Sequence, residues 1–197
     1  VAGQMLKLHQ ETRYPWDGAV RLKIGLNGPA HFTLKLRLPG WCQGFQLHVN
    51  GISVKAPLEH GYLRLERNWK DGDVVAYDMA MPIERIYAHP QVAQDTGRVA
   101  LQRGPLVYCL EQVDHTVPVD QIALPRQAEL QPIFHPDLLG GVVALSGSAS
   151  VAVEDGWEDS LYQVQPAAHK PCQLTAIPYF AWDNRQAGAM CTWLPEI

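Results

Sequence analysis

The sequence contains neither a long hydrophobic run nor a cluster of basic residues. Only 18% of its 197 residues are charged, with 16 Lys and Arg against 20 Asp and Glu. A nucleic-acid-binding surface needs clustered Lys and Arg, and a membrane-spanning helix needs about 20 successive apolar residues. Hydrophobic residues still make up 47% of the chain, which is enough to build a core and argues against disorder. We therefore expect a soluble globular chain with neither a nucleic acid nor a membrane as a partner.

Closely spaced metal ligands and nucleophile motifs are also absent. The eight histidines stand singly, and no His-x-His, His-Glu-x-x-His, Gly-x-Ser-x-Gly or Gly-x-Gly-x-x-Gly pattern occurs. The sequence therefore predicts no catalytic residue and no metal ligand. The cysteines form no Cys-x-x-Cys pair and lie in or beside apolar stretches, so we expect buried free thiols in a reducing compartment such as the cytoplasm, with a disulfide as the alternative. They are Cys42, Cys109, Cys172 and Cys191.

Alternation of apolar and polar residues, typical of β-strands, is the strongest pattern present. Val20–Leu26 and Phe32–Leu38 each place their apolar residues on one face. Asn50-Gly51 between two alternating runs predicts a tight hairpin, because a type I′ turn needs positive φ at both central residues. Leu106–Leu110 is apolar on both faces and predicts a strand covered on both sides, with Cys109 inside.

Gly and Pro together number 31, which favours short strands over long helices, and no helix longer than two turns is predicted. We expect an all-β chain of two small antiparallel, jelly-roll-like β-sandwich domains in series, residues 1–90 and 91–197. In the less regular second half, short strands are expected at Val117–Val119, Ile122–Leu124, Val142–Leu145 and Val151–Val153. The chain starts without an initiator Met, which suggests a piece of a longer polypeptide.

One acidic segment carries a candidate ligand site. Trp157 lies among four carboxylates, Glu154, Asp155, Glu158 and Asp159, and Tyr162 follows. An aromatic platform beside acids suits a carbohydrate contact by Trp157 and Tyr162, and the acids alone would suit a calcium loop. A solvated loop with one anchoring Trp is the plainer interpretation.

Six motifs follow one another along nearly the whole chain: Thr12–Gly18, Leu36–Cys42, Val49–Gly51, Gly61–Leu63 followed by Arg67–Asp73, Gly97–Cys109 and Ile177–Arg185. Taken in this order, they resemble the C-terminal region of glycoside hydrolase family 127, the β-L-arabinofuranosidase family. The resemblance is weakest between Asp114 and Lys170.

The resemblance implies a parent enzyme with an N-terminal (α/α)6 barrel followed by β-sandwich domains. In the family, a cysteine nucleophile near a zinc ion, with glutamate partners, performs retaining hydrolysis, and all of these groups belong to the barrel. This sequence has no adjacent cysteine pair, so no catalytic residue and no zinc ligand carries over to any of its positions. Zinc is expected for the parent and no cofactor for this fragment.

The resemblance favours a non-catalytic accessory region of a bacterial-type glycoside hydrolase, the parent being a β-L-arabinofuranosidase. Its expected partners are its own N-terminal catalytic barrel, a second copy in a homodimer, and a glycan. The alternatives are an independent carbohydrate-binding module and, as a third hypothesis, a fragment that is itself an enzyme.

Overall fold

The computed structural model describes residues 1, 3–153, 156–157 and 160–197, and it is nearly all β. The predicted all-β class is confirmed, with antiparallel pairing between all the named strands of this part of the chain. The helices described are four short 3-10 turns, none of which has the length and apolarity needed to cross a bilayer. The chain divides into two compact units, Val1–Pro82 and Ile83–Ile197, each with a core of its own. The break falls before residue 90 because the strand at Ile83–Ile86 pairs within the second unit.

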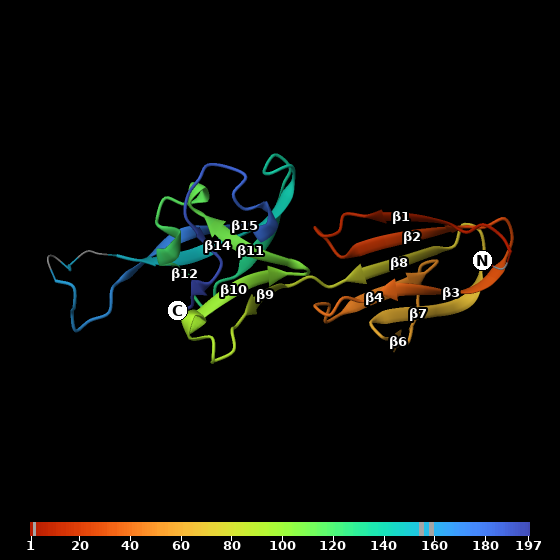
Figure 1. Cartoon of the computed structure of the whole chain (residues 1–197), viewed down its shortest axis with the longest axis horizontal. Coiled ribbons are helices and arrows are strands. Elements are labelled where there is room, and N and C mark those ends of the chain that lie inside the picture. Colours follow the sequence, from red (N-terminus) through yellow and green to blue (C-terminus); the bar gives the residue numbers. More distant parts are fainter. Residues whose placement is uncertain (2, 154–155, 158–159) are drawn as a thin grey trace. The chain divides into compact units, whose positions relative to one another are not determined.

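The first unit is a sandwich of two sheets (Figure 1). The larger sheet has the order β1 (Lys7–Thr12), β2 (Ala19–Gly25), β8 (Val74–Met79), β4 (Phe45–Val49) and β5 (Ile52–Ser53). The smaller sheet has the order β3 (Ala30–Arg37), β7 (Tyr62–Trp69) and β6 (Leu58–Glu59). One core joins them, because alternation turns Leu22 and Ile24 of β2 inward to meet Leu63 and Trp69 of β7. The Trp69 indole is fully buried and donates its N–H to the Phe32 carbonyl at 3.0 Å.

The hairpin predicted at Asn50-Gly51 is confirmed. Asn50 has φ 52° and Gly51 has φ 79°, and Val49 pairs with Ile52 across the turn. The Asn50 side chain also ties the turn to the strand that begins at Val74, donating to Asp73 Oδ1 at 2.9 Å and accepting from the Val74 N–H at 2.8 Å.

The second unit is built on a sheet whose two ends meet. The main order is β12 (Ile122–Ala123), β14 (Val142–Ala152), β15 (His169–Pro178), β11 (Leu106–Glu111), β10 (Arg98–Arg103) and β17 (Leu194–Pro195). β13 (Leu130–His135) pairs with β14, β16 (Met190–Cys191) with β11, and β9 (Ile83–Ile86) with β10. Leu124 donates its N–H to Pro195 and accepts from Ile197, so the residue after β12 joins the β17 end. The sheet thereby surrounds the second core.

Two expectations for this unit were wrong in detail. The runs Val142–Leu145 and Val151–Val153 belong to one 11-residue strand, β14, except for Val153, which lies just beyond its end. The polar segment between the runs stays extended because β13 and β15 pair with it on both sides. Val117–Val119 is no strand, and Val119 begins the 3-10 turn η3 (Val119–Gln121). The expected central position of Cys109 is confirmed: it is 2% exposed on β11, between β15 and β10.

Candidate functional site

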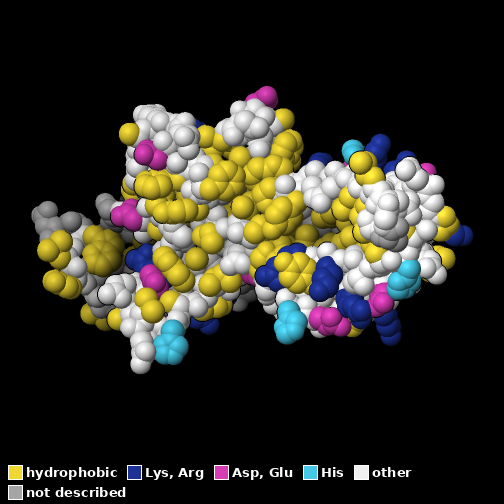
Figure 2. Space-filling model, turned by 45° about the vertical axis from the view of Figure 1, so that its right-hand side comes forward, with side chains coloured by type: hydrophobic (Ala, Val, Ile, Leu, Met, Phe, Trp, Pro, Cys, Tyr) yellow, Lys and Arg dark blue, Asp and Glu magenta, His cyan; other side chains and the backbone are white. Residues whose placement is uncertain are grey.

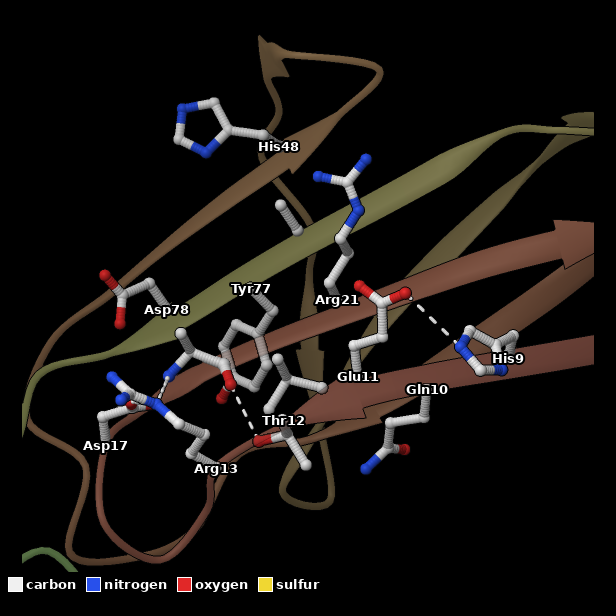
Figure 3. Close-up of a pocket in the computed structure, with 13 residues that line it drawn as sticks. His9, Gln10, Glu11, Thr12, Arg13, Asp17, Arg21, His48, Tyr77 and Asp78 are labelled. Atoms are coloured by element: carbon white, nitrogen blue, oxygen red, sulfur yellow. Dashed lines mark hydrogen bonds and ion pairs between the residues drawn. The ribbon is translucent and has the colours of Figure 1, made fainter.

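A groove runs over the outer face of the larger sheet of the first unit (Figure 3). Its volume is about 740 Å³, and its floor is formed by the small residues Ala19 and Ala76. The strand register places Glu11 beside Arg21, and Arg21 and His48 on either side of Ala76. Side chains that alternate outward from four neighbouring strands therefore converge on one shallow hollow.

Some of the polar groups around this groove are paired with one another. Glu11 lies 3.4 Å from His9 Nε2, and Asp17 Oδ2 accepts a hydrogen bond from Arg13 Nε at 2.8 Å. In the part of the chain that the structure describes, the side chains of Arg21, His48 and Asp78 have no hydrogen-bond or ion-pair partner. These three groups can donate to and accept from hydroxyl groups of a ligand.

The groove offers polar groups but no aromatic face. Tyr77 belongs to its lining through the strand, but the side chain turns into the core and is 5% exposed. Its hydroxyl lies 3.4 Å from the Arg37 carbonyl oxygen, and burial raises the pKa of this phenol. The groove therefore suits hydrogen bonding rather than stacking.

A different kind of surface lies at the end of β15 in the second unit. The strand stops at Pro178 and continues into the 3-10 turn η4 (Tyr179–Ala181), followed by Trp182. Tyr179, Phe180 and Trp182 are 45%, 62% and 37% exposed, although all three are large and aromatic. The rings of Tyr179 and Trp182 stack at 6.0 Å with an interplanar angle of 27°. We call residues Tyr179–Trp182 the aromatic turn.

A largely buried ion-pair cluster holds the chain that follows this turn. Arg185 Nε donates to Glu111 Oε2 at 3.0 Å, and Arg185 Nη1 donates to Asp114 Oδ1 at 2.7 Å. The Asp183 N–H donates to the other Glu111 oxygen at 3.0 Å. The Glu111 side chain is only 6% exposed and that of Arg185 18%. Hydrogen bonding to Asp114 raises the pKa of Arg185, against burial, which lowers it, and Glu111 adds to the increase.

A second buried carboxylate, Glu196, organises another part of the same unit. Glu196 Oε1 accepts hydrogen bonds from Arg85 Nη1 at 2.8 Å and from the Tyr87 hydroxyl at 3.0 Å, while Arg126 Nε lies 3.5 Å from Glu196 Oε2. Arg85 also donates to the backbone carbonyls of Pro125 and Ala128. The cluster therefore fixes the loop at residues 125–128 and the last strand against β9. The neighbouring pocket holds about 360 Å³. Both carboxylate oxygens of Glu196 are thus engaged within the protein, which indicates a structural role.

The residues predicted to contact carbohydrate do not form a recognised site in the structure. Trp157 is half-buried, and its carbonyl accepts a hydrogen bond from Ser160. Tyr162 is 91% exposed, and no ring contact joins it to Trp157 in the described ranges. Glu154, Asp155, Glu158 and Asp159 lie outside the described residues. The carbohydrate contact by Trp157 and Tyr162 therefore stays a prediction.

All four cysteines are free thiols, and their environments disfavour the thiolate. Burial, with the charge of Glu111 second, raises the pKa of Cys109 to about 12. Burial also raises the pKa of Cys42, Cys172 and Cys191. Zinc is bound by thiolates, neutral imidazoles and carboxylates that lie close together, and no group of three His, Cys, Asp or Glu residues that could hold a metal occurs among the described residues. That part of the chain therefore does not fit a zinc site.

Sequence reasoning missed the cluster behind the aromatic turn. Ile177–Arg185 contributes only a family resemblance, and the segment from Glu111 onward has no regular pattern. The signal available is Glu111 itself, an acid placed directly after the fully apolar run Leu106–Leu110. A charge in that position needs a buried partner, but the sequence does not tell which of the six basic residues of the unit supplies it.

Comparisons with known proteins agree across the whole chain. The family model for the "Beta-L-arabinofuranosidase, GH127 middle domain" matches residues 1–81, and that for the "Glycoside hydrolase family 127 C-terminal domain" matches residues 83–195. A non-reducing end β-L-arabinofuranosidase of Bifidobacterium longum subsp. longum is 36% identical over 94% of this chain, which corresponds to 30% of that protein.

Solved structures give the same result. The crystal structure of a GH127 β-L-arabinofuranosidase from Geobacillus stearothermophilus T6 is 46% identical and superposes with a TM-score of 0.94, covering 100% of this chain and 31% of that one. Another structure, of a GH127 β-arabinofuranosidase, is 36% identical with a TM-score of 0.89, covering 98% of this chain and 32% of that one. The chain thus spans less than a third of the length of these relatives, and it belongs to glycoside hydrolase family 127, of which it comprises the middle and C-terminal domains.

Proposed function

We propose that this chain is a non-catalytic accessory region that supports the catalytic barrel of a family 127 glycoside hydrolase, a β-L-arabinofuranosidase, and contributes to contacts between subunits. The observation that carries the proposal is the match of its two units to the middle and C-terminal domains of the family, over less than a third of the relatives' length.

The state of the thiols supports the same function. The cysteine-based hydrolysis implied by the family resemblance needs a thiolate and a positioned acid or base. In this chain burial holds every thiol in its protonated form, most strongly Cys109, whose pKa is raised to about 12. The thiols are therefore poor candidates for a nucleophile.

The proposal is tested by comparing the chain with its parent. The purified chain should release no p-nitrophenol from p-nitrophenyl arabinofuranosides above buffer, with or without zinc and reductant, whereas the chain joined to the upstream barrel should be active. The matched control is the Cys109→Ser variant of the chain, which should give the same background. Zinc-dependent turnover by the chain alone, abolished by replacing one of its four cysteines, would show that the accessory function is wrong.

Carbohydrate binding is the second candidate, and the groove of the first unit favours it. Three groups there, Arg21, His48 and Asp78, are without partners in the described structure and surround a floor of alanines. Retention of the isolated chain on arabinan, abolished by Arg21→Ala together with Asp78→Ala, would support this function. Retention that is abolished instead by Trp157→Ala would assign it to the predicted contact at Trp157 and Tyr162.

A further inference from the structure

The aromatic turn exposes more apolar surface than an isolated unit has reason to expose. Tyr179, Phe180 and Trp182 are consecutive except for the buried Ala181, and their exposed fractions lie between 37% and 62%. Single exposed apolar residues are ordinary on protein surfaces, but adjacent large aromatic residues on one turn form a patch, and such patches mark interaction sites. Figure 2 shows that hydrophobic side chains dominate the visible face of the second unit, with few charges among them.

The conformation of the turn is fixed before any partner arrives. Asn184 Nδ2 donates to the carbonyls of Ala181 and Trp182 at 3.1 and 3.0 Å, and the Asp183 N–H binds Glu111. Arg185 then locks the following chain through its two carboxylate partners. A pre-ordered aromatic group binds with less loss of conformational freedom than a mobile one, which strengthens the interaction it makes.

The polar groups around the turn distinguish a protein partner from a sugar. A sugar site needs donors and acceptors for hydroxyl groups beside its aromatic face. Beside this turn, the guanidinium of Arg185 and the carboxylates of Glu111 and Asp114 are engaged with one another, and the Asn184 amide donates to the backbone. What remains is the tyrosine, phenylalanine and tryptophan surface with one exposed carboxylate, Asp183, at its end. Trp and Tyr are the residue types that dominate the centres of protein–protein interfaces.

We infer that the aromatic turn is the contact through which the second unit packs against the catalytic domain of the parent chain. This inference rests on the proposed function and names the surface that performs it. The partner follows from length: the related structures continue for more than two thirds of their chains beyond the region that this chain matches. An ordered apolar patch is suited to packing against the rest of such a long chain.

The test uses hydrogen exchange on the isolated chain and on the full-length protein. In the full-length protein the backbone amides of residues 179–185 should exchange at least about tenfold more slowly than in the isolated chain, because packing stabilises the turn against opening. Equal exchange in the two proteins would overturn the inference.

Matched variants show whether the aromatic side chains make the contact. Tyr179→Ser with Phe180→Ser should abolish the added protection and lower the unfolding midpoint of the full-length protein by several degrees, while the midpoint of the isolated chain changes much less. The control, Leu161→Ser with Val164→Ser, removes two apolar side chains that are 84% and 103% exposed in the same unit, and it should leave both proteins unchanged. Equal losses in the isolated chain and the full-length protein would show that the turn only stabilises its own unit.

Two further outcomes separate this inference from its alternatives. Retention of the isolated chain on arabinan that disappears in the Tyr179→Ser, Phe180→Ser variant would assign the turn to a glycan and overturn the inference. Failure of the proposed function would be seen in a different measurement, the hydrolysis of a substrate by the isolated chain. That hydrolysis would not depend on residues 179–185.

Discussion

The two units carry charge in opposite ways. Residues 1–82 contain ten Lys and Arg against seven Asp and Glu, whereas residues 83–197 contain six against thirteen. The ion pairs of the first unit lie at the surface, as with Arg13 and Asp17, whose side chains are 83% and 28% exposed. Most of those described in the second unit join largely buried side chains, as with Arg85 and Glu196 at 18% and 8%, although Arg126, the other partner of Glu196, is 72% exposed. Lys, Arg and His are prominent on the visible face of the first unit in Figure 2.

Exposed and buried ion pairs contribute differently to stability. An exposed pair gains little free energy, since water already solvates both groups and salt screens them. A buried pair is expensive to form, and removing one partner leaves the other without compensation. The charges of the second unit therefore determine the conformation of its loops, including the chain after the aromatic turn, while those of the first unit stay available to a ligand.

Among substitutions that probe this difference, Arg185→Met should have the largest effect. It leaves Glu111 buried beside Asp114 without a cation, which should destabilise the second unit by about 3–5 kcal/mol, measured by chemical denaturation of the isolated chain. Adding Glu111→Gln and Asp114→Asn should recover part of the loss, because no unpaired charge then remains. A loss below about 1 kcal/mol for Arg185→Met would mean that this cluster resembles the surface pairs of the first unit.

Gly51→Val tests the first unit through its backbone rather than through charge. Gly51 has φ 79° and nothing within 4 Å of an added Cβ, so the cost is conformational rather than steric crowding with neighbours. Left-handed backbone is unfavourable for a β-branched residue, and we expect a loss of roughly 1–2 kcal/mol in the unfolding of the first unit. Gly28→Ala is a suitable control, since Gly28 also has open space and no positive φ. Unchanged stability of Gly51→Val would contradict the turn geometry.

These two sites also show how far the sequence alone could predict the structure. The Asn50-Gly51 hairpin and the buried face of β2 are local patterns, two to seven residues long, and both were predicted with their correct geometry. The ion-pair cluster joins residues more than 70 positions apart, and nothing local to Glu111 specifies Arg185 as its partner. Strand β14 is an intermediate case, because its polar middle resembles a loop until β13 and β15 pair with it.

The candidate site was likewise predictable from the sequence only where it depends on local pattern. Sequence patterns could place single aromatic residues such as Trp157 and Tyr162, but which side chains converge on one hollow depends on strand order. The groove brings Arg21 of β2 close to His48 of β4 because β8, which follows both strands in the sequence, lies between them in the sheet. The fold class therefore came from local periodicity, and the site required the topology.

Acid should destabilise the second unit through Glu196. Burial raises the pKa of this carboxyl, but hydrogen bonds from Arg85 and Tyr87 and the charges of Arg85 and Arg126 lower it below the ordinary value of 4.5. The contribution of a carboxyl with a lowered pKa is present above its unfolded-state value and is lost as the pH falls through its folded-state value. We expect Glu196→Gln to be less stable than the parent chain near pH 7 and the difference to shrink below about pH 4.5, a smaller effect than that of Gly51→Val. A stability difference that is constant between pH 7 and pH 3 would show that Glu196 acts through packing alone.

Arg13→Ala should have the smallest effect and sharpens the comparison most directly. Arg13 donates to Asp17 in a pair of good geometry, with its Nη2 2.7 Å from Asp17 Oδ2, but its side chain is 83% exposed. Exposed pairs of this kind contribute between about 0 and 1 kcal/mol, so the unfolding free energy of the first unit should change by less than about 0.5 kcal/mol. This small difference between Arg13→Ala and the parent chain should shrink further at high salt, because salt screens the pair. Asp17 keeps its hydrogen bond from the Ala19 N–H, so the loop that borders the groove should retain its conformation. A loss comparable to that of Arg185→Met would mean that the charges of the first unit are structural, and it would remove the reason for regarding the groove as a surface free to bind a ligand.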